Sequence, residues 1–301
     1  MFFNEKKEVL KMGERTIIVF GGNGMLGRDV VASIRDTPSL KWEGFVPSHL
    51  DIDITNKEKL SNYLGKRKPW AVINTAAYTD VDGAQSPEGT SLAMGANYIG
   101  VRNLARICHT LGIILLHVST DYVFSGQADG YAEMSRYDGE PCNIYGVSKK
   151  LGEIALREYC PRHYIVRTSW LMGAHGVNFV KTILKLAKKN SSIRVVNDQW
   201  GVPNYTNDVA DKIITILSHG LEFGIYHPVS HGYCTWYDLA KAAIALRGYP
   251  CEVFPVPTSE FPRPAGRPER SILLNTKFPP GTFWDEGLKD LLARYPDLEN
   301  E

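Results

Sequence analysis

The sequence predicts an α/β fold, in which a doubly wound parallel sheet is joined by a smaller C-terminal α/β domain. Two observations support this prediction. Short, continuously apolar segments such as 16–20 and 71–74 alternate with amphipathic segments of helical length, which is the pattern of βαβ units. The apolar segments lack polar alternation, which is typical of parallel strands that helices cover on both faces. The 301 residues leave room for one large or two modest domains.

The fold is expected to begin at residue 16, after an N-terminal extension of residues 1–15, and its first domain to end at residue 169. Short runs rich in apolar residues predict strands at 16–20, 41–46, 71–74, 112–118 and 164–167. Apolar residues at helical spacing predict helices at 24–35, 56–64, 88–111 and 145–159. Thr55 or Asn56 is the expected cap of the second helix, because both side chains can accept a backbone N–H.

Residues 170–301 are expected to form mainly the second domain, although some of their elements can return to the first sheet. Helical spacing predicts helices at 178–189, 206–219 and 235–246, with short strands at 193–196 and 224–227. Prolines then crowd residues 255–268.

The composition excludes several classes of partner. Lys and Arg total 34 against 33 Asp and Glu, which gives a net charge of +1. The chain therefore lacks the excess of positive charge that is typical of proteins that bind nucleic acid or an anionic membrane. No segment approaches the roughly 20 apolar residues that span a bilayer, and the charged N-terminus has no signal-peptide core. The 5 cysteines form no CxxC pair, so neither disulfides nor zinc are expected. We expect a cytoplasmic protein.

A glycine-rich turn follows the first predicted strand and opens the first predicted helix. GGNGMLG, residues 21–27, has the form GxxGxxG. Glycines allow a tight turn and let the backbone approach a pyrophosphate, which the helix N-terminus attracts. The strand–turn–helix context therefore predicts a dinucleotide-binding domain of the Rossmann type. The expected cofactor contacts in this turn are Gly21, Asn23, Gly24, Met25, Leu26 and Gly27.

The end of the second predicted strand bears on the choice of cofactor. Sites selective for NAD commonly place an acid there to bind the ribose 2′-hydroxyl, and residues 45–49, FVPSH, contain none. This leaves room for a 2′-phosphate near Ser48, so NADPH is expected, with NADH also open because no arginine follows. Asp53 and Ile54 come slightly later and are expected near the adenine. The alternative for Asp53 is a capping role before Asn56.

Tyr145 and Lys149 form a YxxxK motif within a predicted helix, where residues four apart share one face. A lysine ammonium near the phenol is expected to lower the pKa of Tyr145, so that it exchanges a proton with a carbonyl near neutral pH. Thr120 lies in STDYVF, directly after a predicted buried strand. Ligands bind beyond the carboxyl ends of such strands, which places Thr120 to hydrogen-bond a substrate oxygen beside Tyr145.

With these motifs, the chain resembles the dTDP-4-dehydrorhamnose reductase family of the extended short-chain dehydrogenases/reductases. The resemblance extends from Thr16 to Phe278. It is carried by GGNGMLG, LDIDITN, INTAAYTDVDGA, STDYVFSG, NIYGVSKKLGE, VRTSWLMGAHGVNFVKTILKLA, VVNDQWGVP, TWYDLA and FPRPAGRPERS. It implies NAD(P)H-dependent reduction of the C4 ketone of a dTDP-6-deoxy-4-keto-L-hexose, dTDP-4-dehydro-L-rhamnose, to dTDP-L-rhamnose. Such a step belongs to nucleotide-sugar biosynthesis for cell-surface polysaccharide.

The resemblance also implies roles for particular residues. Tyr145 would donate the proton, Lys149 would bind the nicotinamide ribose, and Thr120 would orient the carbonyl. Cofactor contacts would extend to Asp53, Ile54, Ala76, Ala77, Tyr145 and Lys149. The sugar-nucleotide pocket would be lined by Thr79, Val81, Tyr122, Trp170, Asn178, Arg263 and Arg267. The plainer alternatives are a core position for Trp170, solvated loop charges for the two arginines, and structural roles for Asp82 and Asn97.

Some features depart from the family or leave alternatives open. Residues 187–192, AKKNSS, lack the acids through which some members bind Mg²⁺, so no metal is predicted. Trp200 and Asn204 differ from the usual residues, which leaves open a related 4-keto sugar. The rival functions are another nucleotide-sugar 4-ketoreductase, an epimerase, or a non-catalytic NADP-binding regulatory subunit. Retention of Thr120, Tyr145 and Lys149 counts against the last. A homodimer remains open.

Overall fold

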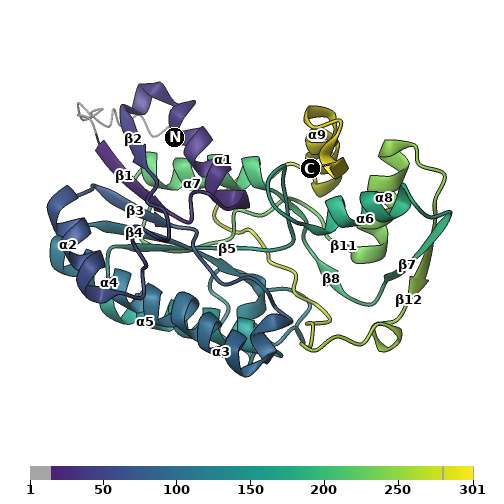
Figure 1. Cartoon of the computed structure of the whole chain (residues 1–301), viewed down its shortest axis with the longest axis horizontal. Helices are drawn as coiled ribbons and strands as arrows, with labels where there is room; N and C mark the ends of the chain where they lie inside the picture. The colour runs from purple at the N-terminus through teal and green to yellow at the C-terminus, as the bar shows by residue number, and fades with distance from the viewer. Residues whose placement is uncertain (1–14, 280, 301) are drawn as a thin grey trace, which may run out of the picture.

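The computed structural model describes residues 15–279 and 281–300, so the expected extension lies outside the described residues except for Arg15. Within these ranges a six-stranded parallel sheet has the order β10-β5-β4-β3-β1-β2 (Figure 1). Its strands are β1 (Arg15–Phe20), β2 (Trp42–Phe45), β3 (Ala71–Asn74), β4 (Ile114–Thr120), β5 (His163–Thr168) and β10 (Gly224–Tyr226). The strand order reverses between β1 and β3, and ligands bind at such a reversal, beyond the carboxyl ends of the strands. The predicted doubly wound parallel sheet is confirmed.

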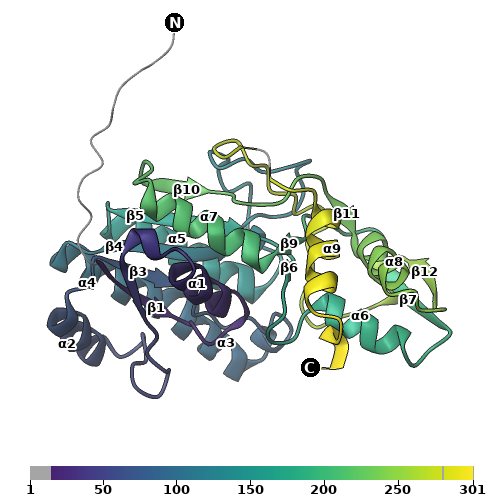
Figure 2. The ribbon, with the colours of Figure 1, turned by 90° about the horizontal axis from the view of Figure 1, so that it is seen from above.

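Helices cover both faces of this sheet (Figures 1 and 2). One face carries α1 (Met25–Arg35) and α7 (Thr206–Ser218), and the other carries α2 (Lys57–Arg67), α4 (Val101–Leu111) and α5 (Ile144–Tyr159). Alternate residues of β1 show why both layers are needed. Ile17 and Val19 belong to the apolar cluster beneath α1 and α7, whereas Ile18 and Phe20 belong to the cluster beneath α4. A strand buried on both sides has no polar alternation, as the sequence indicated.

The segment predicted as one helix over 88–111 is interrupted by a π-helical turn. It consists of α3 (Pro87–Met94), the π-helical Gly95–Gly100, and α4. Asn97 of this turn is fully buried and bonds the backbone N–H and C=O of Tyr78 and the hydroxyl of Ser148. Asn97 therefore joins the loop after β3 to α5, which is the structural role expected for it.

The remaining elements are mostly short and form the second part of the chain. Its pairs of strands are β6 (Leu171–Met172) with β9 (Asn204–Tyr205), β7 (Ser192–Val196) with β12 (Glu252–Val256), and β8 (Trp200–Gly201) with β11 (Cys234–Thr235). Its helices are α6 (Phe179–Ala187), α8 (Trp236–Arg247) and α9 (Trp284–Arg294). Short helical turns lie in both parts of the chain, at Pro38–Leu40, Gly83–Gln85, Asp121–Val123, Thr258–Glu260 and Leu298–Asn300. Two elements of the second half of the chain return to the first sheet: β10 pairs with β5, and α7 packs on α1.

Candidate active site

In the glycine-rich turn between β1 and α1, the backbone packs closely against itself and against the backbone after β3. Gly21 has a φ of +77°, a left-handed conformation that favours glycine. A Cβ at Gly21 would lie 2.4 Å from the N of Ala76, and a Cβ at Gly27 would lie 2.1 Å from the carbonyl O of Gly21. Gly24 caps α1 without any side-chain hydrogen bond from the described residues. The first N–H groups of α1 are therefore available to an anion such as a pyrophosphate.

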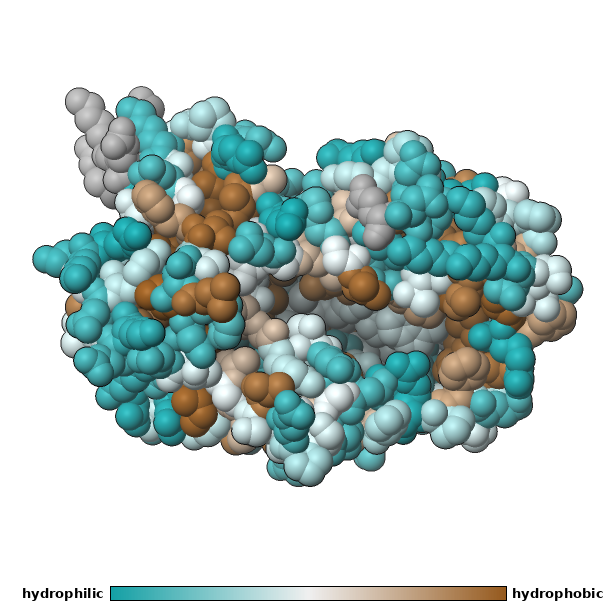
Figure 3. Space-filling view, viewed as in Figure 1, coloured by the Kyte–Doolittle hydropathy of each residue, from teal (hydrophilic) through white to brown (hydrophobic). Residues whose placement is uncertain are grey.

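A cleft of about 970 Å³ opens from this turn and runs between the sheet and the second part of the chain. Figure 3 shows the surface hollowed between these two parts. The predicted site residues that line the cleft are Gly21, Gly24, Met25, Leu26, Gly27, Ala76, Ala77, Thr79, Val81, Thr120, Tyr122, Tyr145, Lys149, Trp170, Asn178, Arg263 and Arg267. The carboxyl ends of β1, β3, β4 and β5 thus meet the predicted substrate residues in one cavity.

Four predicted cofactor residues lie outside the lining of this cleft, namely Asn23, Ser48, Asp53 and Ile54. The hydroxyl of Ser48 bonds the carboxylate of Asp51, and Asp53 accepts the N–H of Thr55. Ile54 is buried in the apolar core. Their contacts with a cofactor stay predictions. The cap of α2 is Asn56, which accepts the N–H of Lys59 at 3.0 Å.

Thr120 and Tyr145 meet because α5 begins directly against the turn after β4. Asn143 caps α5 by accepting the N–H of Gly146 at 2.8 Å. A Cβ at Gly146 would lie 2.3 Å from the carbonyl O of Tyr122, so glycine permits this close approach. Burial raises the pKa of Tyr145 to about 12, while a hydrogen bond with Thr120 acts to lower it. Tyr145 is therefore a protonated phenol at neutral pH.

Lys149 differs from its expected arrangement. Its Nζ donates to the carbonyl O of Val118 at 2.7 Å and lies 3.2 Å from Nε2 of His117. Burial lowers the pKa of Lys149 to about 8. The expected lowering of the pKa of Tyr145 by Lys149 is wrong for this arrangement, because the amino group bonds Val118 and contacts His117, and burial raises the pKa of Tyr145.

Asp121 follows Thr120 in the cleft, and no role in the reaction was predicted for it. Its Oδ1 accepts the hydroxyl of Thr120 at 2.9 Å, and burial raises the pKa of Asp121 to about 7. Asp121 lines the cleft next to both residues that carry the predicted chemistry. Its carboxyl group is therefore close enough to influence the hydroxyl that is expected to face the substrate.

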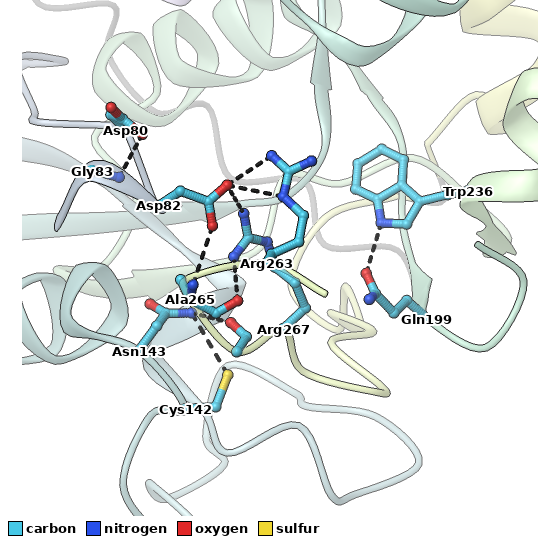
Figure 4. Close-up of polar contacts among 11 residues, drawn as sticks. Asp80, Asp82, Gly83, Cys142, Asn143, Gln199, Trp236, Arg263, Ala265 and Arg267 are labelled. Atoms are coloured by element: carbon cyan, nitrogen blue, oxygen red, sulfur yellow. Dashed lines mark hydrogen bonds and ion pairs between the residues drawn. The ribbon is translucent and has the colours of Figure 1, made fainter. Parts of the chain in front are cut away.

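Trp170 lines the cleft as part of a stacked aromatic pair. Its ring centroid lies 3.4 Å from that of Trp236, with 6° between the ring planes. Gly201 leaves room for the pair, since a Cβ there would lie 2.4 Å from the Trp170 ring. Trp236 Nε1 donates to the side-chain oxygen of Gln199, as Figure 4 shows. Trp236 also lines the cleft, although the sequence did not single it out.

Arg263 and Arg267 converge on Asp82 at the opening of the cleft (Figure 4). The two guanidinium groups lie 2.7 and 3.0 Å from one Asp82 oxygen, and the N–H of Ala265 donates to the other at 3.2 Å. Although burial acts to raise it, these bonds hold the pKa of Asp82 below its ordinary value. One carboxylate faces two guanidinium groups, so a net positive charge remains for an anionic ligand.

Asn178 is fixed on both sides by the protein. Its Oδ1 accepts the N–H of Lys181 as the cap of α6, and its Nδ2 donates to the carbonyl O of Gly173 at 2.8 Å. The side chain therefore holds the loop before α6 at the edge of the cleft, and its contact with substrate stays a prediction.

Among the described residues there is neither a cluster of metal-binding side chains nor a helix that could cross a membrane. Over residues 15–279 and 281–300, no group of three or more His, Cys, Asp or Glu side chains could hold a metal ion. Over the same ranges, no helix has both the length and the apolar character needed to cross a membrane.

Comparison with known proteins extends along nearly the whole chain. The RmlD substrate binding domain model matches residues 15–296. The dTDP-4-keto-6-deoxy-D-glucose reductase of Streptomyces niveus is 38% identical, covering 85% of this chain and 87% of its own. The dTDP-4-dehydrorhamnose reductase of Salmonella typhimurium is 35% identical, covering 92% and 97%. The crystal structure of dTDP-4-dehydrorhamnose reductase from Bacillus anthracis in complex with NADP is 35% identical, with a TM-score of 0.87, and covers 94% and 100%. The chain therefore belongs to the RmlD family of dTDP-4-dehydrorhamnose reductases.

Proposed function

We propose that this chain reduces the C4 ketone of dTDP-4-dehydro-L-rhamnose to give dTDP-L-rhamnose, with NADPH as the reductant. The observation that carries the proposal is the meeting of Thr120 and Tyr145 in one cleft with a glycine-rich turn at one end and an aromatic and basic wall at the other. A ketoreductase needs these three parts: a cofactor site, a proton donor and a site for the remainder of the substrate.

The cofactor end fits a dinucleotide phosphate. The backbone around Gly21 and Gly27 has no room for a Cβ, and the N-terminus of α1 offers free N–H groups. Bound NADPH supplies the hydride. Tyr145 donates its phenolic proton to the oxygen that forms at C4, and a pKa of about 12 keeps that proton in place until the oxygen becomes basic. Thr120 orients the carbonyl.

The other end of the cleft fits a sugar nucleotide. The stacked Trp170 and Trp236 offer an apolar face to the deoxysugar or the base. Arg263 and Arg267 can bind the diphosphate, with Asp82 fixing their positions. The proposal therefore describes a cytoplasmic enzyme of nucleotide-sugar biosynthesis for cell-surface polysaccharide. Its small-molecule partner is a nucleotide sugar.

Gly27→Ala is expected to weaken NADPH binding at least about tenfold and to lower the free energy of unfolding by about 1–3 kcal/mol, the usual cost of overpacking. The added Cβ would lie 2.1 Å from the carbonyl O of Gly21, so the turn must shift. Fluorescence titration and urea unfolding measure the two effects. Gly65→Ala in α2 is the matched control, because a Cβ there has no neighbour within 4 Å. It is expected to leave NADPH affinity unchanged, and equal losses in both variants would contradict the role of the turn.

A second candidate, reduction of dTDP-4-keto-6-deoxy-D-glucose, is favoured by one observation. The Streptomyces niveus relative, 38% identical, is named for that substrate. The two sugars differ in the configuration of their ring carbons, so the shape of the pocket decides between them.

The test is NADPH consumption by the purified chain with a panel of 4-keto sugar nucleotides. The panel contains dTDP-4-dehydro-L-rhamnose, dTDP-4-keto-6-deoxy-D-glucose and the UDP-linked forms of both. We expect the largest kcat/KM with dTDP-4-dehydro-L-rhamnose. A larger value with dTDP-4-keto-6-deoxy-D-glucose would move the assignment to the second candidate. Conversion without net NADPH consumption would indicate an epimerase, and NADPH binding without any conversion would indicate a regulatory subunit.

A further inference from the structure

A buried row of three polar side chains lies beneath the cleft and ends at Lys149. Asn74 at the end of β3 and His117 in β4 are register partners in the sheet, and both are fully buried. Nδ2 of Asn74 lies 3.0 Å from Nδ1 of His117, and Nε2 of His117 lies 3.2 Å from Nζ of Lys149. The proposed reaction gives His117 no role, yet His117 contacts Lys149, which is expected to bind the cofactor.

The hydrogen bonds of this row fix where the proton of His117 lies. The N–H of Ala76 donates to Oδ1 of Asn74 at 3.2 Å, which identifies the other amide atom of Asn74 as the donor group. Nδ2 of Asn74 therefore donates to Nδ1 of His117. An imidazole nitrogen that accepts a hydrogen bond carries no proton, so the proton of neutral His117 is on Nε2.

An Nε2–H that is directed at Lys149 requires an acceptor there. A lysine ammonium has three donors and no acceptor, whereas the neutral amine has a lone pair. The neutral amine accepts from His117 and donates to the carbonyl O of Val118 at 2.7 Å, so every group in the row has a partner. An ammonium in this place would bring one of its own N–H groups against the Nε2–H of His117, and neither group would have an acceptor.

Above about pH 8, the charges around Lys149 agree with a neutral amine. Burial lowers the pKa of Lys149 to about 8 and holds that of His117 well below its ordinary value. Glu153 of α5 acts in the opposite direction, but Arg167 of β5 pairs with it at 2.6 Å. Two further titratable groups among the described residues line the cleft with Lys149: Tyr145, a phenol with a pKa of about 12, and Asp121, with a pKa of about 7. Neither changes its charge between pH 8 and 9 as Lys149 does.

We propose that His117, held as its Nε2–H tautomer by Asn74, positions Lys149 beneath the cleft as a neutral amine in mildly alkaline solution, and that Lys149 takes up a proton when it turns to the cofactor. The ribose hydroxyls that Lys149 is expected to bind, and the phenol beside them, are better served by an ammonium, which donates strongly. Cofactor binding is then coupled to the uptake of one proton from solvent. This inference rests on the proposed binding of NADPH.

The test is calorimetric titration of the full chain with NADPH at pH 9, in two buffers that differ in their heat of ionisation. The difference in heat gives the number of protons taken up. We expect nearly one proton per NADPH, because pH 9 lies about one unit above the pKa of the amine in the free protein. The Kd is expected to rise about fivefold from pH 8 to pH 9 for the same reason.

Two variants separate this role from a structural one. Asn74→Asp is nearly isosteric, and its carboxylate accepts from Nδ1–H, so the tautomer inverts and Nε2 becomes an acceptor for the ammonium. His117→Leu removes the donor to Lys149 altogether. Both are expected to at least halve the proton uptake at pH 9. Asn56→Asp, the same change at the exposed cap of α2, is the control that is expected to keep it.

The tautomer itself is measured without cofactor, by nitrogen NMR of the histidine-labelled chain, with His117→Leu used to assign the signal. The Nε2–H form is expected, and the Nδ1–H form would overturn the inference. Tight NADPH binding without proton uptake, or equal uptake in the wild type and both variants, would also overturn the inference and leave the proposed function standing. Failure to bind NADPH would overturn the two together.

Discussion

Tyr145→Phe is expected to lower kcat at least about hundredfold, the usual contribution of a positioned general acid. The substitution removes only the hydroxyl that bonds with Thr120 and leaves the ring, which packs edge-on against Tyr122 with centroids 5.9 Å apart. NADPH affinity is therefore expected to stay close to that of the wild type. Initial rates of NADPH consumption at saturating sugar nucleotide measure kcat, and fluorescence titration measures the affinity.

Tyr159→Phe is the matched control for this result. Tyr159 is the last residue of the same helix, α5, and its ring lies 4.1 Å from the guanidinium carbon of Arg106, at a distance from the cleft along the helix. The same loss of a hydroxyl there is expected to leave kcat unchanged. Wild-type turnover in Tyr145→Phe would remove Tyr145 from the proposed mechanism, whatever the control shows.

Glu153→Gln is expected to lower the free energy of unfolding by about 3–5 kcal/mol, the usual cost of leaving one member of a buried ion pair unpaired. Glu153 and Arg167 are 0% and 1% exposed, and their closest atoms are 2.6 Å apart. The hydroxyl of Tyr137 donates to the same carboxylate at 2.8 Å. The pair thus fixes α5 to β5 and to the loop that carries Tyr137. Urea unfolding of both forms measures the loss.

The control is Asp290→Asn in α9, which breaks the partly exposed pair between Asp290 and Arg294. A cost below about 1 kcal/mol is expected there, because solvent screens such pairs. Although burial raises it, the charge of Arg167 holds the pKa of Glu153 below its ordinary value, so this stabilisation is present at neutral pH and is lost on acidification. A loss in Glu153→Gln as small as in the control would contradict the account of a buried pair.

The sequence predicted the parts of the site that depend on neighbours along the chain. The turn from Gly21 to Gly27 needs only a strand before it and a helix after it. The YxxxK spacing places Tyr145 and Lys149 on one face of α5 whatever packs against it. The direction of the Lys149 amino group depends on the rotamer of a long side chain and on His117 in a neighbouring strand. Spacing contains no information about either, so the expected effect on Tyr145 was wrong.

The residues that the sequence missed owe their place to distant partners. His117 lies in a run of apolar strand residues and shows no local sign that Asn74 and Lys149 flank it. The sequence assigned Asp82 only a general structural role, because its partner Arg263 lies 181 positions away and a local pattern cannot join them. Trp236 stacks on Trp170 in the cleft, and no local sequence pattern predicts that contact.

Among the regular elements that the sequence did not predict, β12 and α9 were missed for local reasons. The strand β12 contains Pro255, which a β-sheet tolerates only at an edge, and β12 pairs only with β7 among the described residues. The helix α9 contains Gly287, a weak helix former whose lack of a Cβ allows close packing on Tyr205.

The most direct test of the central claim follows the hydride itself. The purified chain is supplied with dTDP-4-dehydro-L-rhamnose and NADPH that carries deuterium at both positions of nicotinamide C4, and the product is analysed by mass spectrometry and NMR. The account predicts dTDP-L-rhamnose that carries one deuterium, bonded to C4 of the sugar, with one NADPH consumed per product. Deuterium at another carbon, or a sugar left unreduced while NADPH is bound, would contradict it.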